Sequence, residues 1–250
     1  MRERTEDFWE ARGQVMGVLA NQPFGEEHER KREERFRRRL LPWTKDLMLR
    51  VGVLPATHLL DLGCGVGDVA AFLASDVHEV TALDGSATML AQARARLAAT
   101  NRRNWRVKHE NLLRLGKVPP NVDLVYIGAV CMYLADDEYR ELLRRIACEA
   151  SRGVFVVERE YVAMNGGMTG IVERGNYRSY RRTVADYVAL AKSEGFSCVL
   201  QRYSSDMYIE RATAAAGALG RGVAAMLRPI GRLVSRQAAG SATFVLRCDT

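Results

Sequence analysis

Three glycines and an aspartate follow a short apolar run in the stretch HLLDLGCGVGD, residues 58–68. Gly63, Gly65 and Gly67 occupy alternate positions, and Asp61 lies two positions before the first of them. Glycine loses more conformational entropy on folding than other residues, so this spacing indicates positive φ angles or close approach of another molecule. An acid at the end of an otherwise apolar strand indicates a polar binding partner. We therefore expect a ligand-binding loop.

A second acid ends the next apolar run, where EVTALDGS places Asp84 seventeen positions beyond Gly67. Ligands in open α/β sheets bind at the carboxyl ends of strands, where helix N-termini offer unpaired N–H groups. Asp84 can accept hydrogen bonds from both hydroxyls of a ribose. The third glycine comes one residue too early for the dinucleotide pattern GxGxxG, and Asp61 suits an ammonium group better than a pyrophosphate. These residues predict a ligand that carries a ribose and an ammonium group but no phosphate.

The elements that must position these residues alternate along the chain. A long helix over 26–51 is expected to carry Phe36, Leu40 and Leu47 on its apolar side and to kink at Pro42. Strands alternating with helices predict a doubly wound, mostly parallel α/β sheet covered on both faces. The expected strands are 58–62, 79–84, 105–110, 122–128, 153–160, 196–203 and 242–248, and the expected helices 68–75, 86–99, 136–150 and 183–195, with Ser86, Asp136 and Thr183 as caps and Gly195 as a stop.

We expect one domain over residues 1–250, with a helical cap over 1–52 and a helical insertion over 209–240 between the last two strands. The insertion has alanine, leucine and valine on one side and arginines on the other. This pattern fits a helix packed on its own domain, a lid, or a helix lying on a membrane surface. Because the apolar side is rich in alanine and has no Trp or Phe to anchor it, packing or lid closure is favoured.

Composition limits the class of protein. The chain has 250 residues and a net charge of +7, which favours anionic partners. No apolar run approaches the roughly 20 residues of a membrane span, and MRERTEDFWEARG contains no apolar stretch typical of a signal peptide. The five cysteines are scattered, without a CxxC pair, and the four histidines are dispersed. We expect a cytoplasmic protein with reduced thiols and no metal site.

Three segments in order resemble the class I S-adenosylmethionine-dependent methyltransferases: LDLGCGVG, TALDGSATMLAQAR and VDLVYIGAVCMYL. The resemblance is good over residues 59–160. It implies a Rossmann-like methyltransferase fold, with S-adenosylmethionine as cofactor, and a methyl transfer in which alignment supplies much of the catalysis. By this resemblance, Asp61 and the loop from Gly63 to Gly67 line the methionine part, and Asp84 holds the ribose. The other cofactor residues that it implies are Cys64, Gly85, Met89, Asn111, Leu112, Ile127 and Gly128. Of these, Gly85 and Met89 are expected beside the adenine, together with Ser86.

The acceptor side is less defined. Tyr133, in CMYL after the fourth strand, and Glu160, at the end of the fifth, are the candidate catalytic residues. For Tyr133 a partly buried core tyrosine is the competing interpretation. Glu158 is a candidate for binding an amine or a cationic group, and the competing interpretation is an ion pair of these two glutamates with Arg159 or with the later arginines. The segment after the fifth strand is expected to be a mobile loop whose anion-binding side chains are Arg174, Tyr177, Arg178, Tyr180 and Arg181.

The sequence leaves four functions open. The first is methylation of an N or O atom of a small, phosphate- or carboxylate-bearing metabolite, natural product or sugar. The others are methylation of a lipid-linked acceptor at a membrane surface, methylation of nucleic acid, and cofactor binding without catalysis. The fourth strand lacks the [DN]PP[FYW] sequence of many base-methylating enzymes, which disfavours nucleic acid. Monomer and homodimer both remain open.

Overall fold

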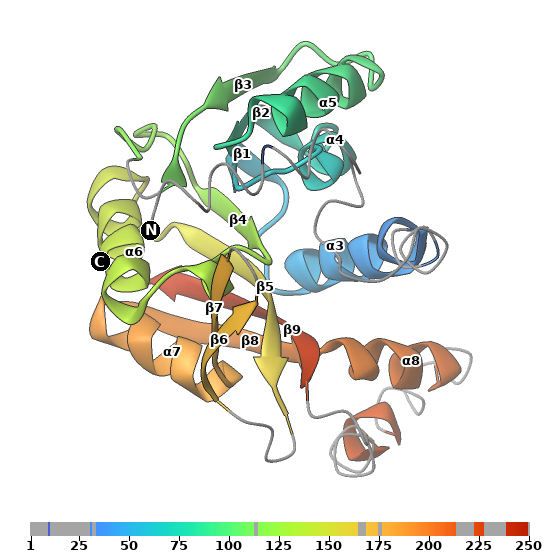
Figure 1. Cartoon of the computed structure of the whole chain (residues 1–250). Helices are drawn as coiled ribbons and strands as arrows, with labels where there is room; N and C mark the ends of the chain where they lie inside the picture. The colour runs from blue at the N-terminus through green and yellow to red at the C-terminus, as the bar shows by residue number, and fades with distance from the viewer. Residues whose placement is uncertain are drawn as a thin grey trace.

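The computed structural model describes residues 10, 31, 34–112, 115–164, 169–174, 177–213, 223–227 and 239–249. Its centre is a sheet in the order β3-β2-β1-β4-β5-β9-β8 (Figure 1). β1 to β5 run parallel, and β9 is antiparallel to both of its neighbours. The mostly parallel, seven-stranded prediction is therefore confirmed. The strands are β1 Ala56–Leu62, β2 Val77–Asp84, β3 Trp105–His109, β4 Leu124–Gly128, β5 Phe155–Ala163, β8 Phe196–Tyr203 and β9 Ala239–Cys248.

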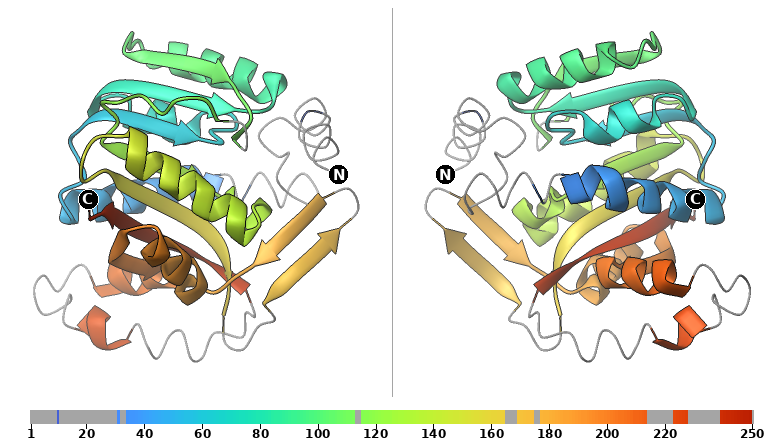
Figure 2. Two further views of the ribbon diagram at one scale, coloured as in Figure 1. Left: turned by 90° about the vertical axis from the view of Figure 1, so that its left-hand side faces the viewer. Right: turned by 90° about the vertical axis from the view of Figure 1, so that its right-hand side faces the viewer.

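Helices cover both faces of this sheet (Figures 1 and 2). The alternation along β1 places Leu60 and Leu62 in the apolar cluster with α6 and α7, and Leu59 in the cluster with α3, α4 and α5. Asp61 has the same parity as Leu59 and shares that second face. The helices are α3 Leu41–Arg50, α4 Asp68–Leu73, α5 Ala87–Ala98, α6 Asp136–Glu149, α7 Val184–Ser193 and α8 Ser204–Thr213.

Two of the three expected helix caps are confirmed. Ser86 accepts from the Met89 N–H, and Thr183 accepts from the Asp186 N–H. The cap at Asp136 is wrong by one residue, because Ala135 is the N-cap and its N–H donates to the Glu138 carboxylate at 2.9 Å. Asp136 is instead bound to an arginine further along the chain, as described below.

The N-terminal helix is irregular just before Pro42. Phe36–Leu40 forms a π-helical turn in which the Leu41 N–H donates to the carbonyl of Phe36. Pro42 follows as the second residue of α3, and the helix continues across it; the expected kink stays a prediction. Leu40 and Leu47 are buried as expected, and Phe36 packs partly buried against the core.

The expected mobile loop after β5 is wrong over residues 170–174 and 177–181. β6 Gly170–Arg174 and β7 Tyr177–Arg181 pair as an antiparallel two-stranded sheet. The register places Ile171 opposite Tyr180 and Glu173 opposite Arg178. Figure 2 shows this hairpin standing apart from the main sheet.

Helix α8, which leads into the expected insertion, packs on the N-terminal helix. Met207 of α8 is buried in a cluster with Leu40, Trp43 and Leu47. A further helical turn covers residues 223–227, in which Ala224 is buried and Met226 is 76% exposed. Arg221 and the rest of the arginine side of the insertion lie outside the described residues. No described helix is long and apolar enough to cross a membrane.

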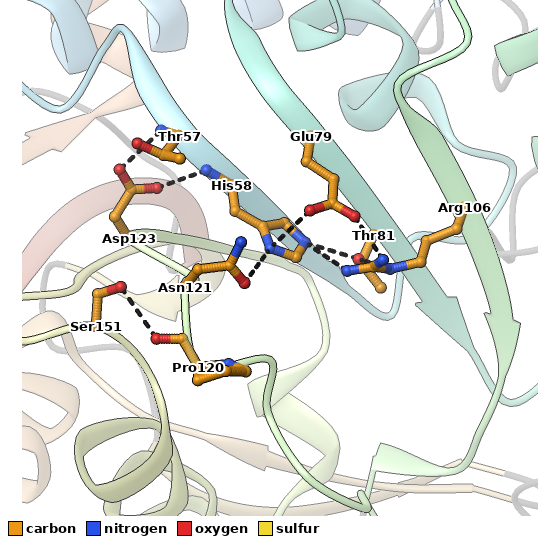
Figure 3. Close-up of polar contacts among 9 residues, drawn as sticks. All are labelled: Thr57, His58, Glu79, Thr81, Arg106, Pro120, Asn121, Asp123 and Ser151. Atoms are coloured by element: carbon orange, nitrogen blue, oxygen red, sulfur yellow. Dashed lines mark hydrogen bonds and ion pairs between the residues drawn. The ribbon is translucent and has the colours of Figure 1, made fainter.

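A polar network joins the amino-terminal half of the sheet (Figure 3). The buried His58 ring lies between Thr81 Oγ1, at 2.8 Å, and Asn121 Oδ1, at 3.1 Å. Asp123 accepts from the His58 N–H at 2.8 Å, and Arg106 donates to Thr81 at 2.8 Å. Because these bonds connect β1 with β2, β3 and the segment before β4, they fix the strand register that brings Asp61 and Asp84 to the opposite edge.

We predict that Gly67→Ala destabilises the fold more than Gly195→Ala. Both glycines have positive φ, 77° and 83°, so alanine is strained at either position, by about 1–2 kcal/mol. A Cβ at Gly67 would also lie 2.9 Å from the Ala93 Cβ, whereas at Gly195 it would meet no atom of the described part of the chain within 4 Å. Urea unfolding measures the difference. Equal losses would show that the contact with α5 does not constrain this loop.

Candidate functional site

The loop between β1 and α4 needs glycine for two separate reasons. Gly63, Gly65 and Gly67 have φ angles of 66°, 53° and 77°, which side chains disfavour. A Cβ on Gly63 would also lie 2.5 Å from Val130 Cγ2, so the loop packs directly against the turn after β4. A Cβ on Gly65 would meet no atom of the described residues within 4 Å. The first of these glycines allows close packing, and Gly65 borders open space.

Asp84 connects this loop to the next one. One carboxylate oxygen accepts from the Gly65 N–H at 2.8 Å and the other from the Ser86 N–H at 2.9 Å. Burial raises the pKa of this carboxyl, while the N–H groups of Ser86 and Gly65 oppose the rise. The side chain is only partly buried, and each oxygen keeps accepting capacity for a further donor. Asp84 is thus held rigidly with free lone pairs at the carboxyl edge of the sheet.

Asp61 lies deeper, on β1. It is 2% exposed and accepts from the Ala70 N–H of α4 at 3.1 Å. Burial raises its pKa to about 7, and the neighbouring Asp84 adds to the rise. Burial likewise raises the pKa of the Cys64 thiol, the residue between the first two glycines. A cation beside Asp61 would stabilise its charged form.

The remaining predicted cofactor residues come together around these two acids. Gly85 approaches Asn111, whose Cα would lie 4.0 Å from an added Cβ, and Leu112 follows in sequence. Met89 forms a small buried apolar cluster with Val66. Ile127 and Gly128 end β4, in register with Leu62 of β1 and Arg159 of β5 respectively. The ends of β1, β2 and β4 and the loops that follow β1 and β2 therefore lie at the same edge of the sheet.

The N-terminal region also reaches this edge. Glu10 accepts from the Ser86 hydroxyl at 2.7 Å and from the Thr88 hydroxyl. These hydrogen bonds, led by the one from Thr88, lower the pKa of Glu10. A carboxylate at the first turn of α5 is also favoured by the helix dipole. Glu10 was missed in the sequence, where no pattern connects it to Ser86.

The turn after β4 is held from both sides. Glu160 accepts from the N–H groups of Val130 and Cys131 at 3.0 and 2.9 Å. Burial raises its pKa to about 7. Tyr133 is half-buried in the short helix Cys131–Tyr133 that this carboxylate holds. A catalytic role for Tyr133 or Glu160 stays a prediction.

Arg182, which the sequence reasoning missed, holds the same turn from the other side. Its guanidinium donates to the carbonyls of Cys131, at 3.1 Å, and Leu134, at 2.7 Å, and to the Asp136 carboxylate at 2.6 Å. It is 5% exposed. A fully buried arginine needs such partners. The one sequence signal was its place directly before the Thr183 cap, which ties it to the start of α7.

Glu158 lies in the core rather than at a pocket mouth. Its carboxyl accepts from the Tyr139 hydroxyl at 2.5 Å, and burial raises its pKa to about 8. A carboxylate oxygen of Glu158, one of Glu160 and the Cys131 sulfur lie within 4.8 Å of one another. The structure connects these groups by hydrogen bonds to Tyr139 and to backbone N–H groups. The acceptor-binding role of Glu158 and the expectation of no metal both stay predictions.

The predicted anion-binding residues lie on the hairpin. Arg178 forms an ion pair with Glu173 at 2.5 Å, on the face that also carries Ile171, 59% exposed. Strand alternation places Tyr180 on this face and Arg181 on the other. The side chains of Arg174 and Tyr177 lie outside the described residues. The hairpin thus divides the expected arginine cluster between two faces.

A surface pocket lies at the amino ends of β1, β2 and β3, away from these loops. It is lined by Thr57, His78, Glu79, Arg103, Asn104, Trp105, Arg106 and Asn121. Ligands of doubly wound sheets bind at the carboxyl ends of the strands. We therefore place the candidate site at the glycine loop and Asp84.

We predict that Glu158→Gln flattens the fall of stability with rising pH. Because the folded pKa is raised to about 8 from about 4.5, the folded state binds more protons than the unfolded state between these values, and stability falls as pH rises through them. The unfolding free energy of the variant should fall less steeply than that of the wild type, by about 1 kcal/mol per pH unit. Urea unfolding at several pH values measures this. Glu141→Gln, on an exposed carboxylate whose pKa is lowered, is the control. Parallel wild-type and Glu158→Gln curves would contradict the prediction.

Comparisons with known proteins find methyltransferases. A family model described as a methyltransferase domain matches residues 59–149. Demethylmenaquinone methyltransferase from Shouchella clausii is 34% identical over 118 residues, 46% of this chain and 49% of that protein. Trans-aconitate 2-methyltransferase from Klebsiella pneumoniae is 31% identical over 113 residues, 44% of this chain and 42% of that protein. The chain thus spans less than half the length of these relatives.

The fold likeness extends further. The crystal structure of magnesium protoporphyrin IX methyltransferase from Synechocystis, with bound S-adenosylmethionine, has a TM-score of 0.65 at 14% identity and covers 98% of this chain and 95% of that one. The segments 60–67, 81–94 and 122–134, which carry the sequence resemblance, form the two loops and the β4 turn of the site. Residues 59–149 thus match a methyltransferase domain, and the chain is similar in fold to a methyltransferase that binds S-adenosylmethionine.

Proposed function

We propose that this protein transfers a methyl group from S-adenosylmethionine to an N or O atom of a small, anionic metabolite. The observation that carries the cofactor part is the Asp84 carboxylate. It is fixed by the N–H groups of Gly65 and Ser86 and keeps lone pairs for two more donors. The open space beside Gly65 leaves room for a bound molecule. These features fit a nucleoside with two ribose hydroxyls.

Different residues of the site would bind different parts of the cofactor. The cofactor supplies a methyl group on a cationic sulfonium. Asp84 would accept both ribose hydroxyls, Asp61 would favour the ammonium group, and Asn111 would accept from the adenine amino group through its amide oxygen. The Gly63–Gly67 loop and the β4 turn pack against each other, so they would fix the direction of approach. Such alignment contributes much of the catalysis in a displacement.

An acceptor that loses a proton needs a base, and Tyr133 and Glu160 are the proposed residues. Glu160 has one carboxylate oxygen occupied by two N–H groups, and the other is buried with no described partner. Its pKa of about 7 lets it exchange a proton near neutral pH. Tyr133 lies on the turn that Glu160 and Arg182 hold, which would keep its hydroxyl in one place.

An anionic acceptor is supported by charge. The chain carries a net charge of +7, and Arg178 and Arg181 lie on a hairpin that follows β5. One relative is named for trans-aconitate, a polycarboxylate. A small-molecule acceptor, a cytoplasmic location and a single domain over residues 1–250 remain part of this proposal.

A lipid-linked acceptor is the second candidate, and one observation favours it. Val223, Met226 and Leu227 are 39%, 76% and 41% exposed on the short helical turn of the insertion. Exposed apolar side chains on a cationic protein fit a membrane surface. One relative is named for demethylmenaquinone.

We predict that S-adenosylmethionine and its demethylated product bind and that NAD does not. Asp84→Ala should weaken cofactor binding by about 1.5–3 kcal/mol, because it removes charge-assisted hydrogen bonds. Calorimetry measures both. Asp137→Ala, an exposed carboxylate on α6, is the matched control and should leave the affinity unchanged. NAD binding without S-adenosylmethionine binding would overturn the cofactor assignment, and an unchanged affinity in Asp84→Ala would move the ribose elsewhere.

We predict that label from [methyl-¹⁴C]S-adenosylmethionine enters an anionic fraction of a cell metabolite extract. The extract is separated by anion exchange, and its lipids are counted apart. Once an acceptor is purified, Arg178→Ala with Arg181→Ala should raise its KM several-fold while the cofactor Kd stays within about twofold, since the hairpin lies apart from the glycine loop. Label in the lipid extract alone would make the second candidate the better one, and no transfer at all would favour a non-catalytic cofactor-binding protein.

A further inference from the structure

Arg159 is a cation for which the described part of the chain offers no carboxylate. It lies in the middle of β5 (Phe155–Ala163), in register with Gly128 at the carboxyl end of β4. Its guanidinium carbon stands 4.8 Å from the ring centre of Phe36 and 5.9 Å from that of Tyr161. No ion pair joins it to a described acid. Its Nε is buried and has no hydrogen-bond partner among the described residues. The ion pair with Glu158 or Glu160 that the sequence allowed is therefore not formed among these residues.

Strand alternation explains why that pair does not form. Glu158 and Glu160 point toward the α6 and α7 face, where Tyr139 and the Val130–Cys131 turn hold them. Arg159, between them in sequence, points toward the face that carries Phe36. Arg159 still lowers the pKa of Glu160 electrostatically, but without contact.

A second unsatisfied polar group lies on the same face. Tyr126 of β4 is opposite Asp61 of β1 and is 2% exposed. Its hydroxyl is buried without a described hydrogen-bond partner. Burial raises its pKa, and Arg159 is the nearby charge that most opposes the rise. Buried hydroxyl groups and guanidinium nitrogens are almost always hydrogen-bonded.

Three polar residues on this face lie on neighbouring strands and differ in charge. Asp61 on β1 is acidic, Tyr126 on β4 is a neutral hydrogen-bond donor, and Arg159 on β5 is basic. A guanidinium fork matches the two oxygens of a carboxylate, and the rings beside it fix its plane. We propose that Arg159, assisted by the Tyr126 hydroxyl, binds a carboxylate group in the site.

The inference rests on the proposed function, which supplies two sources of a carboxylate. One is the methionyl carboxylate of the cofactor, whose ammonium group would lie on the Asp61 side. The other is a carboxylate of the acceptor. Both use the same chemistry, and binding of cofactor fragments separates them.

The experiment measures calorimetric binding of three probes to the full chain. S-adenosylhomocysteine carries the amino-acid carboxylate, 5′-methylthioadenosine lacks it, and trans-aconitate, added with saturating S-adenosylhomocysteine, represents an acidic acceptor. The variants are Arg159→Met, Arg159→Lys and Tyr126→Phe. Arg140→Met, an exposed arginine on α6, is the control. Urea unfolding checks that each variant is folded.

Arg159→Met should lose about 10- to 100-fold in affinity for one carboxylate probe while 5′-methylthioadenosine binds within about twofold of wild type. Loss for S-adenosylhomocysteine assigns the cofactor carboxylate, and loss for trans-aconitate alone assigns the acceptor. Arg159→Lys should lose part of this affinity because an ammonium group cannot form the fork, and Tyr126→Phe should lose less. If Arg159→Met does not fold, Arg159→Lys against Arg140→Lys makes the same comparison.

Two results would overturn the inference: unchanged binding of both carboxylate probes in a folded Arg159 variant, or an equal loss for S-adenosylhomocysteine and 5′-methylthioadenosine. Failure of wild-type protein to bind either adenosine probe would instead refute the proposed function, whatever the arginine variants show.

Discussion

The hydrogen bonds from two separate loops to the Asp84 carboxylate are the interaction on which the site depends. One donor belongs to the glycine loop after β1 and the other to the start of α5. Because each loop follows a different strand, the parallel register of β1 and β2 must be correct before both N–H groups can meet one side chain. The His58 network at the other end of these strands supports that register (Figure 3). Fold and site are therefore connected through two strands.

β5 shows how one strand can serve two unlike environments. Glu158 and Glu160 enter a hydrogen-bonded core beneath α6 and α7, where burial raises the pKa of both. Arg159 faces the aromatic rings of Phe36 and Tyr161 on the other side. An arginine between two glutamates in the sequence suggests local ion pairs. In a strand, however, neighbouring side chains point to opposite faces, so Arg159 is separated from both glutamates. Opposite charges that are neighbours in sequence are thus free to meet different partners.

Sequence pattern was sufficient for the sheet and for the loops around Asp61 and Asp84. Those features depend on local signals: alternating apolar runs, glycines that require positive φ, and caps such as Ser86 and Thr183. The errors arose where distant contacts decide. Asp136 is not the N-cap of α6; its carboxylate instead binds Arg182, 46 residues away. Residues 170–174 and 177–181 pair as two strands although the glycines of this segment resembled a loop. Arg182 and Glu10 could not be found from spacing, since their partners are far along the chain.

The contact between α8 and the N-terminal helix has a consequence for how such enzymes can be recombined. Met207, from the segment after β8, shares a buried cluster with Leu40, Trp43 and Leu47. The two segments are separated by most of the sheet in sequence, yet each covers apolar surface of the other. Phe36, on the π-helical turn that leads into α3, also stacks on Arg159. A chimera that takes its N-terminal helix from one homologue and α8 from another would therefore mismatch the apolar side chains that pack between them, and the two segments must be exchanged together.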